Sequence, residues 1–228
     1  MYVVLSYVIS EEGPYFPGAP ETEFKQFTSL EEGDPLNTSE IKLFMHSGTH
    51  VDVPYHFHTQ GITLDKLNAE DWIYTSPKFV DCSQRASNGI DRADLEKHFV
   101  ENDDSDLLLL YTGMGSLRST EPEEYIHKSP WLTEEAALFL VDETRVRGLA
   151  IDFLTVDEIA SMTGKGLYPV HEILMGCPGK SKSGRYIFIY EDSNLEPAVD
   201  KNLSKVYAVP LLLKGLEGAP VTMFAELK

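Results

Sequence analysis

Imidazole and carboxylate side chains gather in one short segment of this chain. Four of its seven histidines, His46, His50, His56 and His58, lie there with Asp52 among them. Imidazole nitrogens and carboxylate oxygens are the usual protein ligands of zinc and of related divalent ions. The segment therefore predicts a divalent-metal centre.

The segment is predicted to be extended, although the four-residue spacing of His46 and His50 is also typical of a helical metal pair. Gly48, Pro54 and three β-branched residues disfavour a helix. In a strand the five polar side chains occupy even positions and share one face. The alternate face is apolar and predicted to pack, and it consists of Met45, Val51, Val53, Tyr55 and Phe57.

Bond lengths then constrain the path of the chain. Four extended residues span about 13 Å, too far for His46 and His50 to reach one ion through bonds of about 2 Å. The chain must therefore bend between them, where Gly48 lies, and again after Asp52, where Pro54 lies. Without any bend, His50 and Asp52 are only about 6.6 Å apart and can share an ion.

Two imidazoles and one carboxylate are a recurring ligand set for catalytic zinc that leaves a position open for water. His56 lies beyond the second bend, so it is predicted to act on that water rather than to bind the ion. Ser47 and Thr49 are expected to form hydrogen bonds with the ligands.

The segment also carries a family resemblance. Residues 46–57, HSGTHVDVPYHF, match every fixed position of H-x-G-T-H-x-D-x-P-x-H-F, the signature of the cyclase family. That family includes the bacterial-type kynurenine formamidases and the isatin hydrolases. Weaker similarity at residues 15–18 (YFPG) and 149–157 (LAIDFLTVD) extends the resemblance over most of the chain.

The resemblance implies a swivelling β/β/α-type single domain that forms a homodimer or homotetramer. It implies one or two divalent metals, with zinc expected and manganese as the alternative. By the family pattern, His46, His50 and Asp52 bind the first metal and His56 is the general acid and base.

In binuclear members a later His and a Glu hold a second metal, with the Asp bridging. His171 and Glu191 match those positions. The stretch between them is several residues longer than in the formamidases, because a basic loop, PGKSKSG at residues 178–184, is inserted. Asp192 and Glu196 therefore remain alternatives to Glu191, and the loop is expected to change the rim of the pocket.

Charge and cysteine content exclude other classes of protein. The chain has 19 Lys and Arg against 37 Asp and Glu, a net charge of −18. Nucleic acids and anionic membranes select basic surfaces, so neither is expected as a partner. The resemblance implies a small-molecule substrate instead. Two cysteines, Cys82 and Cys177, form no disulfide framework and are expected to be small buried residues. The apolar start of the chain has no basic leader region, which predicts a cytoplasmic protein.

Strands outnumber helices, and the two alternate along the chain. Apolar runs predict strands at residues 2–9, 78–82, 106–112, 149–153, 185–190, 205–214 and 221–227. Helices are predicted at residues 91–100, 134–147 and 168–175, with Asp91 and Thr133 as N-caps and Gly148 and Gly176 as stops. Residues 11–38, rich in Gly and Pro, are predicted to be a long loop or oligomer arm. Residues 1–228 then form one mixed α/β domain with a largely β core and flanking helices.

The other candidate residues have weaker signals. His58, His98 and His127 are expected at the surface. Tyr15, Phe16 and Trp72 are expected to pack in the core, with a planar-substrate pocket as the alternative.

The function predicted from these residues and the resemblance is metal-dependent hydrolysis of a small amide, such as the arylformamide N-formylkynurenine. Two alternatives remain open. One is the opening of a cyclic amide, as in isatin hydrolysis, or action on another small carbonyl compound. The other is a metal-binding protein without turnover, which the presence of His56 disfavours.

Overall fold

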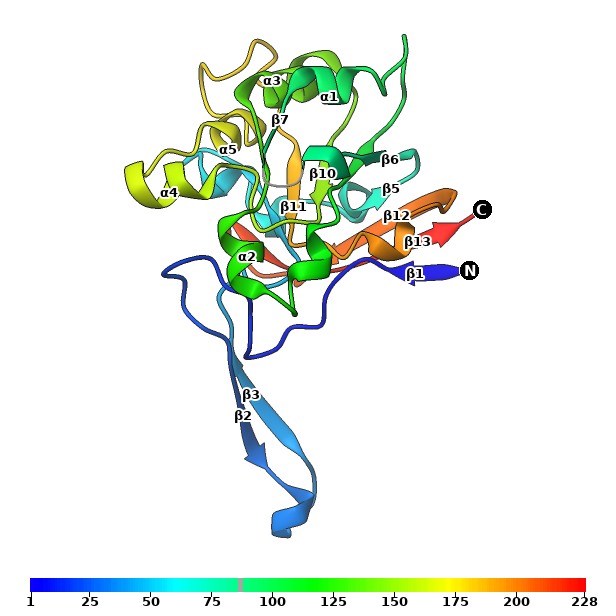
Figure 1. Cartoon of the computed structure of the whole chain (residues 1–228). Coiled ribbons are helices and arrows are strands. Elements are labelled where there is room, and N and C mark those ends of the chain that lie inside the picture. The colour runs from blue at the N-terminus through cyan, green and yellow to red at the C-terminus, as the bar shows by residue number, and fades with distance from the viewer. Residues whose placement is uncertain (86–87) are drawn as a thin grey trace.

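Nine strands form one mixed sheet that organises the chain (Figure 1). They are β1 (Tyr2–Val4), β4 (His50–Asp52), β5 (Ile73–Tyr74), β6 (Pro77–Asp81), β8 (Leu107–Tyr111), β10 (Gly148–Ile151), β11 (Phe188–Glu191), β12 (Leu203–Pro210) and β13 (Gly218–Leu227). Their order is β5-β12-β13-β4-β11-β10-β8-β6, with β1 paired to β13. This computed structural model describes residues 1–85 and 88–228. Because β12 also lies against β6, the sheet is nearly closed.

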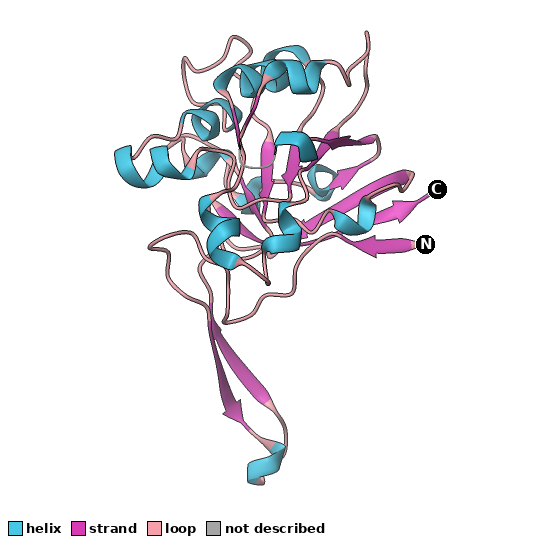
Figure 2. Ribbon diagram, viewed as in Figure 1, coloured by secondary structure: helices cyan, strands magenta, loops and turns pink. Residues whose placement is uncertain are grey.

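The helices are short and flank the sheet (Figure 2). They are α1 (Arg92–Glu96), α2 (Pro122–His127), α3 (Glu134–Glu143), α4 (Ile159–Lys165) and α5 (Pro169–Leu174). A small separate sheet joins β7 (Gly89–Ile90) to β9 (Trp131–Leu132). Within the described ranges no helix has the length and apolar composition that a membrane crossing requires. The molecule is thus a single mixed α/β domain with a β core, as predicted.

The core lies on both faces of the sheet. In β8, Leu108 and Leu110 belong to the apolar cluster beneath the helices, whereas Leu107 and Leu109 belong to the cluster on the opposite face. β6, β8, β10 and β11 are parallel to their neighbours within this half of the sheet. Parallel strands covered on both faces have continuous apolar sequences, which explains the unbroken leucine run.

The helix starts agree with prediction better than the helix ends do. The side chains of Asp91 and Thr133 accept hydrogen bonds from the first turns of α1 and α3. However, α3 ends at Glu143 rather than at residue 147, because Thr144 is already extended and leads the chain toward β10. Arg147 lies beyond the helix and donates to the backbone carbonyls of residues 71 and 73. Gly148 starts β10 rather than stopping a helix, and α1 also ends early, at Glu96 instead of near residue 100.

Two predictions for the N-terminal region are corrected. The strand expected at residues 2–9 is only Tyr2–Val4, followed by a single bridge between Ser6 and Ser193. The segment 11–38 is not a continuous loop, because it holds β2 (Glu23–Thr28), which pairs with β3 (Thr38–Lys42). The resulting hairpin projects away from the body as an arm (Figure 1).

The hairpin carries apolar side chains that the body does not cover. Five of them are exposed, namely Phe24, Phe27, Leu30, Leu36 and Ile41. Phe27 is the most exposed of the five, at 72%.

A buried ion pair joins β11 to the segment before α2. The Arg118 guanidinium donates two hydrogen bonds to the Asp192 carboxylate, at 2.7 and 2.6 Å, and the Tyr125 hydroxyl donates a third at 2.6 Å. Only 10% of the Arg118 side chain and 2% of the Asp192 side chain are exposed. The guanidinium also lies over the Tyr7 ring, 4.2 Å from its centroid. This pair therefore ties the N-terminal segment to the end of β11.

Removing Arg118 is predicted to be costly. In Arg118→Met the Asp192 carboxylate stays buried without its cation, so the free energy of unfolding should fall by about 3 to 5 kcal/mol. The control is Arg92→Met, which breaks a 2.6 Å ion pair with Glu143. In that pair the Arg92 side chain is 43% exposed and the Glu143 side chain is 49% exposed. That change should cost much less, because solvent screens an exposed pair. Urea unfolding of both variants measures the difference, and equal losses would contradict the prediction.

Candidate metal centre

Strand β4 lies in the middle of the sheet and carries two of the predicted ligands. It pairs on one side with β11, which sets His50 opposite Glu191. It pairs on the other side with β13, which sets Asp52 opposite Gly218. The two predicted bends are present: Gly48 has a φ of +63°, and Pro54 starts a 3₁₀ turn after β4. Both ligands are therefore fixed by backbone pairing on both sides.

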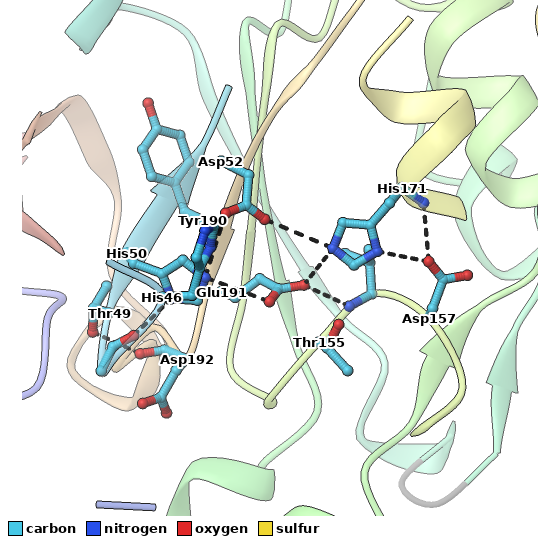
Figure 3. Close-up of polar contacts among 12 residues, drawn as sticks. His46, Thr49, His50, Asp52, Thr155, Asp157, His171, Tyr190, Glu191 and Asp192 are labelled. Carbon is cyan, nitrogen blue, oxygen red and sulfur yellow. Dashed lines mark hydrogen bonds and ion pairs between the residues drawn. The ribbon is translucent and has the colours of Figure 1, made fainter. Parts of the chain in front are cut away.

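The buried Asp52 carboxylate is the centre of a cluster of imidazoles and carboxylates (Figure 3). Its Oδ1 lies 2.8 Å from His46 Nδ1 and 3.5 Å from His50 Nε2. Its Oδ2 lies 3.7 Å from His171 Nε2. Glu191 closes the cluster, 3.4 Å from His171 Nε2 and 3.6 Å from His50 Nε2.

These five side chains form two groups that could each hold a metal ion. One group is His46, His50 and Asp52, and the other is Asp52, His171 and Glu191. Asp52 belongs to both groups, the position that the resemblance implies for a bridging carboxylate.

Hydrogen bonds from outside the cluster orient the second group. The Asp157 carboxylate accepts from His171 Nδ1 at 2.6 Å and from the backbone N–H groups of Val170 and His171 at 2.9 and 3.0 Å. It therefore fixes both the ring and the first turn of α5. The Glu191 carboxylate accepts from the backbone N–H of Val156 at 2.8 Å. These contacts turn His171 Nε2 and the Glu191 carboxylate toward Asp52 (Figure 3).

Thr49 joins the two ligand-bearing strands. Its hydroxyl donates to the backbone carbonyl of Asp192 at 2.6 Å and accepts from the N–H of Tyr7 at 2.9 Å. His50 Nδ1 donates to the carbonyl of Gly48 at 2.9 Å, so its Nε2 faces the cluster.

The structure also distinguishes among the three acids proposed at the second group. Asp192 is bound by Arg118 and Tyr125, and Glu196 accepts from Tyr111. Glu191 alone of the three lies in the cluster.

Electrostatics favour a cation at this cluster. His50 Nε2 and Asp52 Oδ2 are buried with no hydrogen-bond partner among the described residues, an arrangement that is costly unless a ligand satisfies them. Burial by itself lowers the pKa of His46, but the Asp52 carboxylate outweighs burial and raises the pKa to about 10. The pKa of His171 is also raised, against burial, by its carboxylate partners Asp157, Asp52 and Glu191.

The raised pKa values of His46 and His171 reflect an excess of negative charge around these rings. Asp52 and Glu191 carry two negative charges, and a divalent cation would take the place of the protons that His46 and His171 hold without it. The donor set, three imidazoles and two carboxylates, is one that zinc and manganese accept. The residues therefore fit a divalent metal ion.

A cavity of about 520 Å³ opens onto the cluster. The ligands form one wall, and the other walls are apolar and aromatic: Phe16, Phe44, Phe57, Leu154, Met162 and Tyr168. The His56 side chain also lines the cavity and stacks on His46, with ring centroids 4.2 Å apart. Burial lowers the pKa of His56 to about 4. His56 is therefore neutral at physiological pH and able to accept a proton.

Several other sequence predictions are settled by this geometry. The 3₁₀ turn at Pro54 ends the strict alternation. Tyr55, predicted on the packing face, is therefore exposed (42%), whereas Phe57 packs against the core as predicted and also lines the cavity. The basic loop at residues 178–184 lies over α3, where its backbone donates to Asp142, and lines a separate cavity. The expectation that it forms the rim of the metal cavity is therefore wrong.

The remaining candidates lie outside the metal cavity. Trp72 is buried against Phe188, and the Tyr15 hydroxyl donates to nearby backbone carbonyls. His127 is exposed beside Glu123. His58 and His98 are half-buried and do not line the cavity. Cys82 and Cys177 are buried and free, as predicted.

Sequence reasoning missed two acids beside the cluster. Asp157 had one weak signal, its place at the end of the family-like stretch 149–157. Glu217, whose Oε1 lies 3.4 Å from His46 Nε2, had none, because only the pairing of β13 with β4 brings it there.

Comparisons with known proteins find relatives in sequence and in fold over nearly the whole chain. The kynurenine formamidase of Geobacillus thermodenitrificans is 29% identical over 222 residues, covering 96% of this chain and 94% of that protein. The fold is shared with isatin hydrolase A from Labrenzia aggregata, bound to benzyl benzoate (TM-score 0.80, 19% identity, 99% of this chain and 93% of that one). It is also shared with isatin hydrolase A from Ralstonia solanacearum (TM-score 0.81, 19% identity, 100% and 92%). The family model described as putative cyclase matches residues 3–158, more than half of the chain. The protein belongs to the putative cyclase family.

Proposed function

We propose that the protein is a metal-dependent hydrolase that cleaves the amide bond of a small aromatic compound. The observation that carries the proposal is the pair of ligand groups sharing Asp52 at one wall of a cavity that also contains His56. The relatives named kynurenine formamidase support an arylformamide, such as N-formylkynurenine, as the substrate. The aromatic side chains of the other walls suit a planar substrate.

In this proposal His46, His50 and Asp52 hold one divalent ion, and Asp52, His171 and Glu191 hold a second. Zinc is the expected metal and manganese the alternative. When bound, such an ion supplies two things: it acidifies water toward neutral pH and polarises a carbonyl oxygen.

His56 moves the proton. Its neutral imidazole accepts the proton of the water that attacks the amide carbonyl. It then returns that proton to the leaving nitrogen, which is a poor leaving group as an anion. Stacking on His46 holds the ring beside the ligands during both steps.

A cyclic amide is the second candidate substrate, because the aromatic cavity suits a fused ring as well as it suits an arylformamide. Ring opening of isatin would use the same residues in the same roles. A metal-binding protein without turnover has no need of an imidazole placed beside the ligands, so His56 disfavours that alternative.

We also propose that the hairpin β2–β3 is an oligomer arm covered by a second copy of the chain, as a homodimer or homotetramer. Its five exposed apolar side chains support this proposal, because apolar side chains left uncovered on one projecting element are typical of a protein–protein contact. We place the protein in the cytoplasm, where two buried free cysteines stay reduced.

Substitutions at His56 and Asp52 separate binding from chemistry. His56→Ala should keep the bound metal and lose about 10²- to 10⁴-fold in kcat, the usual contribution of a general acid–base group. Asp52→Ala should lose metal, because both groups depend on that carboxylate. Metal per chain is measured by plasma mass spectrometry, and turnover by formate release from N-formylkynurenine and ring opening of isatin. If His56→Ala turned over substrate as fast as the wild type, the role assigned to His56 would be refuted. If the wild type hydrolysed neither amide, both candidate substrates would be refuted.

The lowered pKa of His56 predicts an unusual titration. Because burial lowers the pKa to about 4, the neutral base dominates above that pH and is lost only as the pH falls through it. In the metal-free protein the Cε1–H resonance of His56, assigned with His56→Gln, should stay flat between about pH 8 and pH 5. A midpoint near the ordinary value of about 6.5 would contradict the prediction.

The arm proposal is tested by charging its apolar surface. The double variant Phe27→Asp/Ile41→Asp should convert an oligomer into a monomer, because buried charges oppose association. Light scattering after gel filtration measures the mass. Val100→Asp, at an equally exposed apolar residue far from the hairpin, is the control and should not change it. A monomeric wild type, or an oligomer that survives the double substitution, would rule out the arm.

A further inference from the structure

Each imidazole of the cluster has one nitrogen facing Asp52 and one facing outward. His50 turns Nε2 inward, 3.5 Å from Asp52 Oδ1, and donates from Nδ1 to the carbonyl of Gly48. His171 also turns Nε2 inward and donates from Nδ1 to Asp157. For both rings, the outward acceptor fixes which nitrogen keeps its proton.

His46 is reversed relative to the other two rings. Its Nδ1 is the inward nitrogen, 2.8 Å from Asp52 Oδ1. Its Nε2 is buried, faces outward and has no hydrogen-bond partner among the described residues. The nearest acid is Glu217, whose Oε1 lies 3.4 Å away. Glu217 does not line the metal cavity and belongs to neither ligand group among the described residues. It therefore lies on the outward side of His46, as Asp157 lies on the outward side of His171, but at 3.4 Å rather than at the 2.6 Å of the Asp157 hydrogen bond.

The backbone holds Glu217 in this place. Its carbonyl accepts a hydrogen bond from the N–H of Val53 at 3.0 Å, directly after β4. The next residue, Gly218, pairs with Asp52. A Cβ at Gly218 would lie 2.7 Å from the carbonyl oxygen of Val51 and 3.0 Å from Cε1 of His46. Only glycine allows this close approach, so the segment is packed directly against the His46 ring.

We infer that Glu217 is a positioning residue of the metal centre: it accepts the Nε2 proton of His46 and so presents Nδ1 to the metal, whereas His50 and His171 bind through Nε2. This inference rests on the proposed metal centre and adds a residue outside it. A carboxylate behind a ligand imidazole fixes the tautomer and raises the basicity of the ring, so it raises metal affinity. Its oxygen lies beside the imidazole, and Glu217 belongs to neither ligand group in the described part of the chain.

Zinc affinity of the full-length protein tests the inference. Competition with a chromophoric chelator should show that Glu217→Ala weakens zinc binding by about 10- to 100-fold. Glu217→Gln keeps an acceptor oxygen and should lose less. Glu226→Gln, at the far end of β13, is the matched control and should bind as the wild type does, whereas Asp157→Asn should show a loss of the same kind as Glu217→Ala. The thermal unfolding midpoints of the metal-free wild type and variants are compared as well. Equal midpoints would show that weaker zinc binding does not come from a folding defect.

The tautomer gives a readout that a merely structural role would not produce. Long-range ¹H–¹⁵N correlation spectra of the zinc-loaded protein should show the His46 proton on Nε2 and the protons of His50 and His171 on Nδ1. Coordination of His46 through Nε2, or zinc affinity in Glu217→Ala within about twofold of the wild type, would overturn the inference. If the wild type takes up no zinc or manganese, the proposed metal centre fails and this role fails with it. If the wild type binds and Glu217→Ala binds equally well, only the role of Glu217 is lost.

Discussion

Burying a negatively charged carboxylate is costly unless nearby groups stabilise its charge. The Asp52 carboxylate, at the centre of this fold, is such a group. It is completely buried, and its pKa is held well below the usual range, against burial, by His46, His50 and His171. An isolated charge in such a place would cost several kcal/mol. The three imidazoles offset part of the cost, and the carboxylate of Glu191 adds to it. The remaining imbalance is negative, which is why the site suits a divalent cation.

The sheet supplies the rigidity that this arrangement needs. Because β4 is paired on both sides, neither His50 nor Asp52 can move without breaking backbone hydrogen bonds to β11 or β13. The partner strands then contribute their own acids: Glu191 belongs to β11 and Glu217 immediately precedes β13. The Arg118–Asp192 pair holds the residue after Glu191. Glu191 of the cluster and Asp192 of the structural ion pair are thus consecutive at the end of β11.

Local chemistry was predictable from sequence, and long-range pairing was not. The bends at Gly48 and Pro54 followed from bond lengths, and the caps Asp91 and Thr133 followed from side-chain chemistry. The choice between Glu191 and Asp192 did not, because it depends on the register of β11 against β4 and on the positive φ of Asp192, 49°, which turns that residue toward Arg118. The hairpin was missed because its strands, residues 23–28 (EFKQFT) and 38–42 (TSEIK), are exposed on both faces and so have no alternation of apolar and polar residues. Glu217 was missed because its only relation to His46 is made by the sheet.

The two ligand groups differ in how much of the chain must fold to create them. His46, His50 and Asp52 come from one short segment, so bringing them together costs little loop-closure entropy. Asp52 and His171 are separated by about half of the chain, and Glu191 lies farther still. The second group consequently exists only after β4 has paired with β11. This pairing joins segments that are far apart in the sequence, so it is expected late in folding. A fluctuation that separates these two strands would dissolve one group and leave the other nearly complete, so under the two-metal proposal the two positions would exchange ions on different timescales.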